Sequence, residues 1–201
     1  MSTFRFAIMG AGNIAHQFCD AVTLVEDCYV SAIASKDLGR AQKFAEECSV
    51  AHAYDNYEQM LIEEKPDCVY IAVTPNDHFR LTMLCLEHRV PVLCEKAMFT
   101  NSAEAKAVFE KAEKDQTFVM EAMCSRFLPA VNQAKKWAAE GKIGRLEALQ
   151  GRIGFLAPEG ADNRYHSPLL CGGAATDITV YAYEIATWLV NEPVRKTYAA
   201  A

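Results

Sequence analysis

The sequence lacks the cysteine spacings that metal sites and disulfide frameworks require. Its eight cysteines include no C-x-x-C pair, and most of them fall inside apolar runs. Zinc sites are usually built on such pairs, and disulfide frameworks belong mainly to small secreted domains. We therefore predict reduced thiols in the core of a cytoplasmic protein, and no metal site.

An excess of positive charge and a long apolar run are also missing. The 20 Lys and Arg are outnumbered by 26 Asp and Glu, which gives a formal net charge of −6. Nucleic acids and anionic membrane surfaces are bound through clustered basic residues, and a membrane span needs about 20 consecutive apolar ones. We therefore expect no nucleic-acid partner and no membrane partner.

The opening segment, MSTFRFAIMG, lacks the basic stretch, long apolar core and cleavage site of a signal peptide, and we expect it to contain a first strand instead. Of the 201 residues, 51% are hydrophobic and 23% are charged. This composition is typical of a globular protein, and the length suits one domain or slightly more.

Residues 1–123 alternate between strand patterns and helix patterns. Near-continuous apolar strands separated by amphipathic helices predict a parallel sheet with helices on both faces. We therefore expect a doubly wound α/β domain. The expected strands are 4–9, 28–34, 67–73, 90–94 and 117–123, and the expected helices are 13–25, 38–48, 55–63, 77–88 and 101–114.

The pattern changes over residues 124–201. Periodicity predicts helices over 128–140 and 177–190 and strands over 145–155 and 194–201, with an irregular stretch before the second helix. This order predicts an α+β domain with an open sheet that is incomplete.

The first expected strand runs directly into GAGNIA, which has the pattern Gly10-x-Gly12-x-x-Ala15. In this Gly/Ala variant of the dinucleotide-binding pattern, Gly10 permits a tight turn, Gly12 lets the backbone approach a pyrophosphate, and Ala15 lets the helix lie close to the sheet. Asn13 and Ile14 open the helix whose first N–H groups would face the phosphates. We predict a dinucleotide site; a purely structural turn is the alternative.

The end of the second expected strand bears on which dinucleotide is bound. An acidic residue there would accept hydrogen bonds from the ribose 2′-hydroxyl, whereas basic residues would suit a 2′-phosphate. The sequence has Ser35 at this position, Lys36 beside it and Arg40 one helical turn later, which favours NADP over NAD. In the alternative, Asp37 fills the acidic role; we expect Asp37 to cap the following helix.

Two further strand ends carry polar residues. VTPNDHF places Thr74, Asn76 and His78 where they would line the nicotinamide end of the cofactor, although a solvated His78 in a surface helix is equally consistent with the sequence. VLCEKAM places Glu95 and Lys96 at the next strand end, and we expect Glu95 to contact the cofactor. Lys96 can hydrogen-bond a substrate oxygen or a ribose hydroxyl and favour the ionised form of a neighbouring acid, or it is a solvent-exposed lysine.

The segment CGGAATDITVYAYEIATWLV contains Asp177 and Tyr181, which are four residues apart and therefore on one helix face. Two interpretations stay open. The residues are a functional pair, or Asp177 caps the helix and Tyr181 belongs to the apolar stripe that includes Ile185 and Leu189.

Together, GAGNIA, VLCEKAM followed by EA, and GGAATDITVYAYEIATWL resemble the glucose–fructose oxidoreductase, inositol dehydrogenase and MocA-like family in order and spacing. FVMEAMCSRFLP and the Asp177-x-x-x-Tyr181 pair are most similar to the branch of dimeric dihydrodiol dehydrogenases and NADP-dependent D-xylose dehydrogenases. The resemblance covers essentially the whole chain.

The resemblance implies a dinucleotide-binding Rossmann domain over 1–123 and a partial substrate domain over 124–201, whose open sheet would form a homodimer interface. It also implies hydride transfer between NADP and the hydroxyl carbon of a sugar or trans-dihydrodiol. Carried onto this sequence, Tyr181 would remove the hydroxyl proton, Lys96 would stabilise the developing oxyanion, and Asp177 would orient the substrate.

The irregular stretch APEGADNRYHSPLLCGG supplies candidates for the sugar pocket. Arg164 is the first of these, with Asn163 and Tyr165 beside it. A surface loop without a ligand is the alternative interpretation of these residues.

The sequence also departs from this family. Ala97 stands where a proline usually follows the lysine, Cys171 replaces the first residue of a glycine triplet, and the chain is short. An unfinished sheet would expose apolar surface and strand edges, so we expect the sequence to be a fragment of a longer protein. Two alternatives to an active dehydrogenase stay open: a non-catalytic NADP-binding regulatory protein and an inactive truncated fragment.

Overall fold

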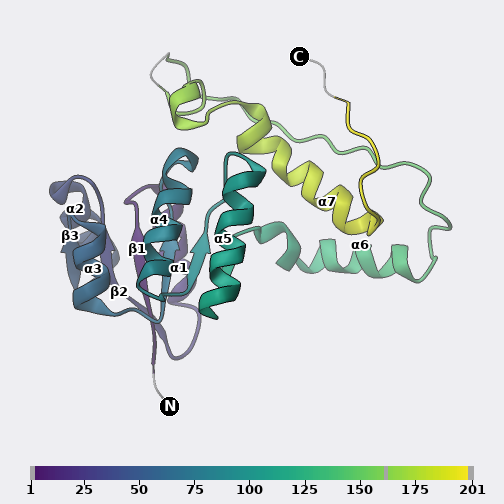
Figure 1. Ribbon diagram of the computed structural model, residues 1–201. Coiled ribbons are helices and arrows are strands. Elements are labelled where there is room, and N and C mark those ends of the chain that lie inside the picture. The colour runs from purple at the N-terminus through teal and green to yellow at the C-terminus, as the bar shows by residue number, and fades with distance from the viewer. Residues whose placement is uncertain (1–2, 161–162, 199–201) are drawn as a thin grey trace. The chain divides into compact units, whose positions relative to one another are not determined.

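The computed structural model describes residues 3–160 and 163–198. The chain divides into two compact units, Met1–Ala122 and Met123–Ala201, which we call unit 1 and unit 2 (Figure 1). Within the described ranges, no helix is both long and apolar enough to cross a membrane.

Unit 1 is built on one six-stranded sheet in which all neighbouring strands are parallel. The strands are β1 (Phe4–Met9), β2 (Cys28–Ala34), β3 (His52–Tyr54), β4 (Cys68–Ile71), β5 (Val92–Cys94) and β6 (Val119–Glu121). They lie in the order β3-β2-β1-β4-β5-β6, so the chain switches from one side of β1 to the other between β3 and β4. In such sheets the ligand crevice lies beyond the carboxyl ends of the strands at this switch point.

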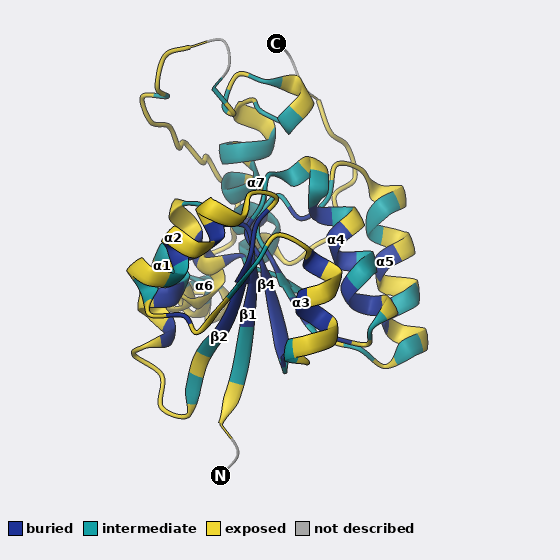
Figure 2. Cartoon of the chain, turned by 90° about the vertical axis from the view of Figure 1, so that its left-hand side faces the viewer, coloured by how far each residue is buried: buried dark blue, intermediate teal, exposed yellow. Residues whose placement is uncertain are grey.

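Helices cover both faces of this sheet. They are α1 (Asn13–Val22), α2 (Leu38–Cys48), α3 (Tyr57–Glu64), α4 (Pro75–Glu87) and α5 (Ser102–Asp115). Figure 2 shows α1 and α2 on one face and α3, α4 and α5 on the other. Within β1, Ile8 belongs to the apolar cluster under α1 and α2, and Ala7 and Met9 belong to the cluster under α3 and α4. The predicted doubly wound α/β fold is confirmed.

Local sequence signals set most of the helix starts. Asp37, Asn56 and Asn101 cap α2, α3 and α5, because each side chain accepts a hydrogen bond from an amide of the first turn. Pro75 opens α4, where the N–H that proline lacks is not needed. The capping role predicted for Asp37 is therefore confirmed.

The sequence patterns did not predict β3. This strand pairs with β2, with His52 opposite Ala32, and it forms the edge of the sheet. Three residues are too few to show a periodicity, and none of the three is fully buried. The strand forms because the backbone N–H and C=O groups along this side of β2 need hydrogen-bonding partners.

The regular elements in the described residues of unit 2 are all helices, and residues 146–160 form no regular structure. These elements are the 3₁₀ helix Cys124–Phe127, α6 (Pro129–Ala139), the 3₁₀ helix Pro168–Leu170, the π-helix Ala175–Thr179 and α7 (Val180–Val190). The strand predicted over 145–155 is wrong, and residues 194–198 of the other predicted strand form none; residues 199–201 lie outside the described residues. A strand needs a neighbour for its backbone hydrogen bonds, and the described residues of unit 2 provide no ladder.

A buried carboxylate organises the helices of unit 2. Glu184, in the middle of α7, is 8% exposed and accepts a 2.9 Å hydrogen bond from the Ser125 hydroxyl. It also pairs with Arg126, whose guanidinium lies over the Trp188 ring. Because a buried charge is costly unless it is paired, these contacts fix α7 against the 3₁₀ helix that precedes α6.

The eight cysteines are free thiols, and Cys19, Cys68, Cys85 and Cys94 are buried. Burial raises the pKa of both Cys19 and Cys68 to about 12, so their thiols stay protonated at neutral pH. The described residues contain no group of His, Cys, Asp and Glu arranged to hold a metal ion.

Gly10 ends β1 at φ +109°, and a Cβ built on it would lie 2.7 Å from the carbonyl oxygen of Ala72. Gly10→Ala should therefore lower the free energy of unfolding by about 2–3 kcal/mol, because the backbone angle and the contact are both strained. Urea unfolding followed by circular dichroism measures this loss. In the control Gly154→Ala, the added Cβ meets no described atom within 4 Å, so the change should stay below about 0.5 kcal/mol. Equal effects of the two changes would contradict the geometry.

Candidate functional site

The turn between β1 and α1 leaves room beside a helix N-terminus. Gly12 stands at the N-cap of α1, where no side chain supplies a capping hydrogen bond. A Cβ built on Gly12 would meet no described atom within 4 Å. Asn13 is exposed and Ile14 is 40% exposed, although the next residue, Ala15, is fully buried. The first N–H groups of α1 therefore face open space, an arrangement that suits an anion.

Arg40 extends from α2 to this glycine turn. Ser35, directly after β2, is 6% exposed, and its Oγ accepts a 3.5 Å hydrogen bond from the Asp37 amide. Asp37 in turn accepts a 2.8 Å hydrogen bond from the Arg40 amide. The Arg40 guanidinium donates to the carbonyl oxygen of Ala11 at 3.4 Å, so its charge lies at the turn that carries Gly12.

Lys36 is paired with an acid that the sequence patterns did not single out. Its Nζ lies 2.5 Å from Oδ2 of Asp77, and Nε of Arg80 donates to Oδ1 of the same carboxylate at 3.3 Å. Burial works against the ionised form of Asp77, but the hydrogen bonds from Lys36 and Arg80 prevail and lower the pKa of this carboxyl. Two cations, Lys36 and Arg80, are therefore paired with one anion, Asp77, between the end of β2 and the start of α4.

His78 is not exposed to solvent, so the interpretation as a solvated surface residue is wrong. Its ring is fully buried, with Nδ1 3.0 Å from the carbonyl oxygen of Ala97 and Nε2 3.0 Å from that of Val73. Burial lowers the pKa of His78, although the neighbouring carbonyls work in the opposite direction. Both ring nitrogens are thus engaged within the protein, and His78 ties the residue after β4 to the loop after β5.

The other predicted residues after β4 and β5 are at least partly accessible. Thr74 stands at the N-cap of α4 without a side-chain capping bond, and Asn76 is exposed in the first turn. Glu95 accepts hydrogen bonds from the Tyr70 hydroxyl at 2.5 Å and from the Lys96 amide at 3.3 Å. Burial raises the pKa of Glu95, although the hydrogen bond from Tyr70 works in the opposite direction. Lys96 itself is half-buried.

A second residue that the sequence patterns missed holds the loop of Lys96. Glu121, the last residue of β6, accepts a 2.9 Å hydrogen bond from the Met98 amide. His78 contacts the carbonyl of Ala97 in the same loop, and the Lys96–Ala97 peptide bond is cis. The loop is therefore held from α4 and from β6. The signal in the sequence that could have identified Glu121 is a charged residue at the end of a short apolar strand.

In unit 2, Asp177 and Arg164 are brought together. Asp177 lies inside the π-helix, and its amide donates to the carbonyl of Gly173, which precedes that helix. No side-chain capping bond is formed there, so the interpretation of Asp177 as a helix cap is wrong. Its carboxylate accepts a 3.4 Å hydrogen bond from Arg164. The Arg164 guanidinium lies 3.9 Å from the centre of the Tyr165 ring, and the Tyr165 amide donates to the Asn163 side chain at 3.1 Å. The irregular loop is thus joined to the π-helix by an ion pair and contains a hydrogen bond of its own.

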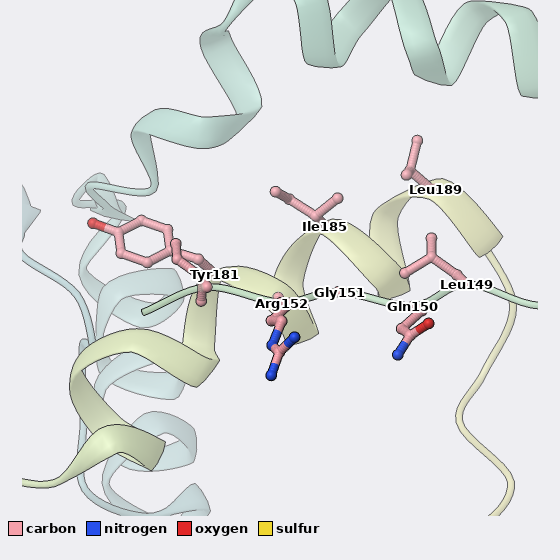
Figure 3. Close-up of a pocket in the computed structure, with 9 residues that line it drawn as sticks. Leu149, Gln150, Gly151, Arg152, Tyr181, Ile185 and Leu189 are labelled. Atoms are coloured by element: carbon pink, nitrogen blue, oxygen red, sulfur yellow. The ribbon is translucent and has the colours of Figure 1, made fainter. Parts of the chain in front are cut away.

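Tyr181 lines a pocket of about 280 Å³ within unit 2. Figure 3 shows the segment 149–153 beside α7, with Tyr181, Ile185 and Leu189 on the helix. Most of the lining is apolar, and Arg152 and Gln150 are its polar members apart from Tyr181. Tyr181 therefore belongs to the apolar stripe of α7 and also lines a pocket, and Figure 3 shows its hydroxyl directed away from the other labelled lining residues.

The residues at the carboxyl edge of the unit 1 sheet fit a dinucleotide. Gly12 leaves space for a pyrophosphate beside the first N–H groups of α1, and the guanidinium of Arg40 lies next to that turn. The Lys36 side chain is 68% exposed one residue after the buried Ser35. These groups are an uncapped helix N-terminus and two cations, which together match a phosphorylated ligand.

Comparison with known sequences identifies similarity over nearly the whole chain. The profile of the GFO/IDH/MocA oxidoreductase family, described as an NAD-binding Rossmann fold, matches residues 4–123. The profile of the GFO/IDH/MocA C-terminal domain matches residues 131–201. The two matched segments follow the order predicted from the motifs.

Curated relatives and solved structures agree with these matches. A mouse trans-1,2-dihydrobenzene-1,2-diol dehydrogenase is 31% identical over 92% of this chain and 56% of its own length. A Haloferax volcanii D-xylose 1-dehydrogenase (NADP(+)) is 30% identical over 94% of this chain and 58% of its own length. The crystal structure of an NAD-binding protein from Listeria innocua has a TM-score of 0.84 at 22% identity, over 94% of this chain and 56% of that chain, and supports the fold. The chain thus spans little more than half the length of these proteins.

Replacing Gly12 tests the glycine turn directly. Gly12→Ala should weaken NADP binding by at least about tenfold, because the added Cβ would occupy the space that a phosphate must enter. Its melting temperature should fall by no more than about 4 °C, since the Cβ meets no described atom in the free protein and the remaining cost is that of alanine at an N-cap. Isothermal titration calorimetry and thermal unfolding measure the two effects. Unchanged NADP affinity in this variant would show that the nucleotide binds elsewhere.

Proposed function

Because this chain belongs to the GFO/IDH/MocA oxidoreductase family, we propose that it is part of an NADP-dependent dehydrogenase that acts on sugar or trans-dihydrodiol hydroxyl groups. The observation that carries the proposal is the uncapped start of α1 at Gly12, with open space where a side chain would stand. Such a turn lets an anion, such as the pyrophosphate of a dinucleotide, come close to the backbone.

The choice of NADP over NAD is supported by charge. The residue after β2 is Ser35 rather than an acid, and the nearby Asp37 carboxylate is engaged as the cap of α2. Lys36 and Arg40 are exposed cations on the same stretch. A ribose 2′-phosphate would find two basic side chains there, whereas Ser35 is neutral and one oxygen of the Asp37 carboxylate is engaged in capping α2.

The proposed reaction assigns one task to each of three side chains. When the cofactor is bound, its nicotinamide ring would accept the hydride. Tyr181 removes the proton from the substrate hydroxyl as the carbon gives up its hydride. Lys96 stabilises the negative charge that develops on the substrate oxygen. Asp177 accepts a hydrogen bond from a second hydroxyl and thereby orients the substrate. Arg164, which donates a hydrogen bond to Asp177, lies beside it.

The substrate class follows from the chemistry of these groups. An acid and a guanidinium side by side, as in Asp177 and Arg164, can accept from and donate to neighbouring hydroxyl groups. The pocket beside Tyr181 is largely apolar, with Gln150 and Arg152 as polar members. Sugars and cyclic diols both carry hydroxyl groups on adjacent ring carbons, and the names of the relatives, dihydrobenzene-diol and D-xylose dehydrogenases, point to substrates of this class.

Cofactor preference tests the basic residues of unit 1. NADP should bind at least about tenfold more tightly than NAD, because a 2′-phosphate gains charge-assisted hydrogen bonds from Lys36 and Arg40. Lys36→Ala and Arg40→Ala should each reduce NADP affinity and leave NAD affinity within about twofold. Calorimetric titration of each variant with both nucleotides provides the measurement. Equal affinity of the wild-type chain for NADP and NAD would exclude the assigned 2′-phosphate site.

A paired substitution on α7 tests the proposed proton acceptor. Tyr181→Phe should lower the rate of NADP reduction with D-xylose or a trans-dihydrodiol by about a hundredfold or more, because no phenolic oxygen remains to take the proton. NADP affinity should stay unchanged. Tyr183→Phe is the matched control on the same helix, where the side chain is 57% exposed, and should keep full activity. Normal turnover by Tyr181→Phe would leave Tyr181 with a structural role only.

A further inference from the structure

The two basic residues assigned to the 2′-phosphate have different surroundings. The guanidinium of Arg40 donates to the carbonyl of Ala11, and it forms no ion pair with any described residue. Lys36, in contrast, is already in an ion pair: its Nζ lies 2.5 Å from the Asp77 carboxylate. A phosphate that approaches Lys36 therefore meets a cation whose hydrogen-bonding partner is another anion.

Asp77 is held firmly in this position. It lies in the first turn of α4, where the helix N-terminus favours a negative charge, and its side chain is only 16% exposed. The guanidinium of Arg80 donates to its second oxygen at 3.3 Å and lies over the ring of Tyr57. Lys36 is by comparison 68% exposed, so the lysine is the member of the pair that is able to move.

We propose that Asp77 is a specificity-determining residue of the cofactor site, because its carboxylate competes with a ribose 2′-phosphate for Lys36 and so limits the preference for NADP over NAD. This inference rests on the proposed function, in which Lys36 and Arg40 bind the 2′-phosphate.

The competition follows from charge alone. A phosphomonoester carries nearly two negative charges at neutral pH, so it is repelled by a carboxylate that lies within hydrogen-bond reach of the same ammonium group. Lys36 must leave Asp77 or share its N–H groups between two anions. A ribose 2′-hydroxyl carries no charge and can itself donate to the Asp77 carboxylate. Asp77 therefore weakens NADP binding and does not weaken NAD binding.

Calorimetric titration of the purified chain tests this role with four probes: NADP, NAD, adenosine 2′,5′-bisphosphate and adenosine 5′-monophosphate. Asp77→Asn should bind NADP and the bisphosphate about fivefold more tightly than the wild type, as expected when one competing ion pair near the surface is removed. Binding of NAD and the monophosphate should change by less than about twofold. The gain should shrink at high salt, because the competing attraction is screened.

A matched control removes a similar ion pair at the other edge of the sheet. Asp115 ends α5, lies 2.8 Å from Lys111 Nζ and has a side chain that is 17% exposed, close to the value for Asp77. In a parallel sheet with covering helices, the ends of the helices lie at the amino edge of the strands, opposite the ligand edge. Asp115→Asn should leave the affinity for all four probes unchanged.

A double-mutant cycle tests whether Asp77 affects NADP binding through Lys36. In a Lys36→Ala background, Asp77→Asn should strengthen NADP binding less than it does with Lys36 present, because only the direct repulsion between the carboxylate and the phosphate is then removed. Asp77→Ser, which also removes the charge, should reproduce the gain if Asp77→Asn unfolds, and thermal unfolding checks both variants.

The outcomes separate this inference from the proposed function. If Lys36→Ala weakens NADP binding while the neutral Asp77 variants leave it unchanged or weaker, the NADP site stands and the role of Asp77 is overturned. If neither Lys36→Ala nor Arg40→Ala alters NADP binding, the cofactor assignment itself is overturned, and the inference with it. A gain for NADP and NAD alike would show that Asp77 opposes the common part of the two nucleotides, which also overturns its role in specificity.

Discussion

The functional edge of unit 1 depends on β1 pairing in parallel with β2 on one side and β4 on the other. Parallel pairing brings the ends of all three strands to one edge of the sheet, and the polar residues that follow each strand meet there. The constraint is tightest at Gly10, whose amide donates to the carbonyl of Ala34 at 2.8 Å and which has no room for a Cβ beside Ala72. The glycine turn is therefore held by the two neighbouring strands before any ligand arrives.

The polar residues at this edge divide between structural and accessible groups. His78 and Glu121 are engaged with backbone groups of the loop after β5, and Glu95 is engaged with the hydroxyl of Tyr70. These contacts fix the loop of Lys96, so its backbone is positioned independently of a ligand. Lys36, Asn13 and Asn76 remain exposed. A rigid set of internal hydrogen bonds thus supports a smaller set of side chains that can change partners, which is how binding sites in α/β proteins reach defined geometry.

Sequence patterns formed by neighbouring residues predicted the fold well, but they did not predict contacts between residues that are far apart in the sequence. The order of strands and helices, the glycine turn and the cap formed by Asp37 all depend on residues close in sequence, so patterns revealed them. The contact of Asp77 with Lys36 spans 41 residues and that of His78 with Ala97 spans 19, and neither contact carries a periodic signal. The strand expected over 145–155 failed for a related reason: its apolar residues predict a strand, but a strand also needs a paired neighbour, which the pattern of one segment does not reveal. The roles of Lys96, Tyr181 and Asp177 in catalysis stay predictions.

Hydrogen exchange with and without NADP tests most directly whether the carboxyl edge of unit 1 is the nucleotide site. The account predicts that saturating NADP slows amide exchange in residues 10–16 and 35–41, because the phosphates bind the glycine turn and the cations after β2. Exchange in the last turn of α5, at the opposite edge, should not change. Slower exchange elsewhere, with residues 10–16 unaffected, would contradict the account.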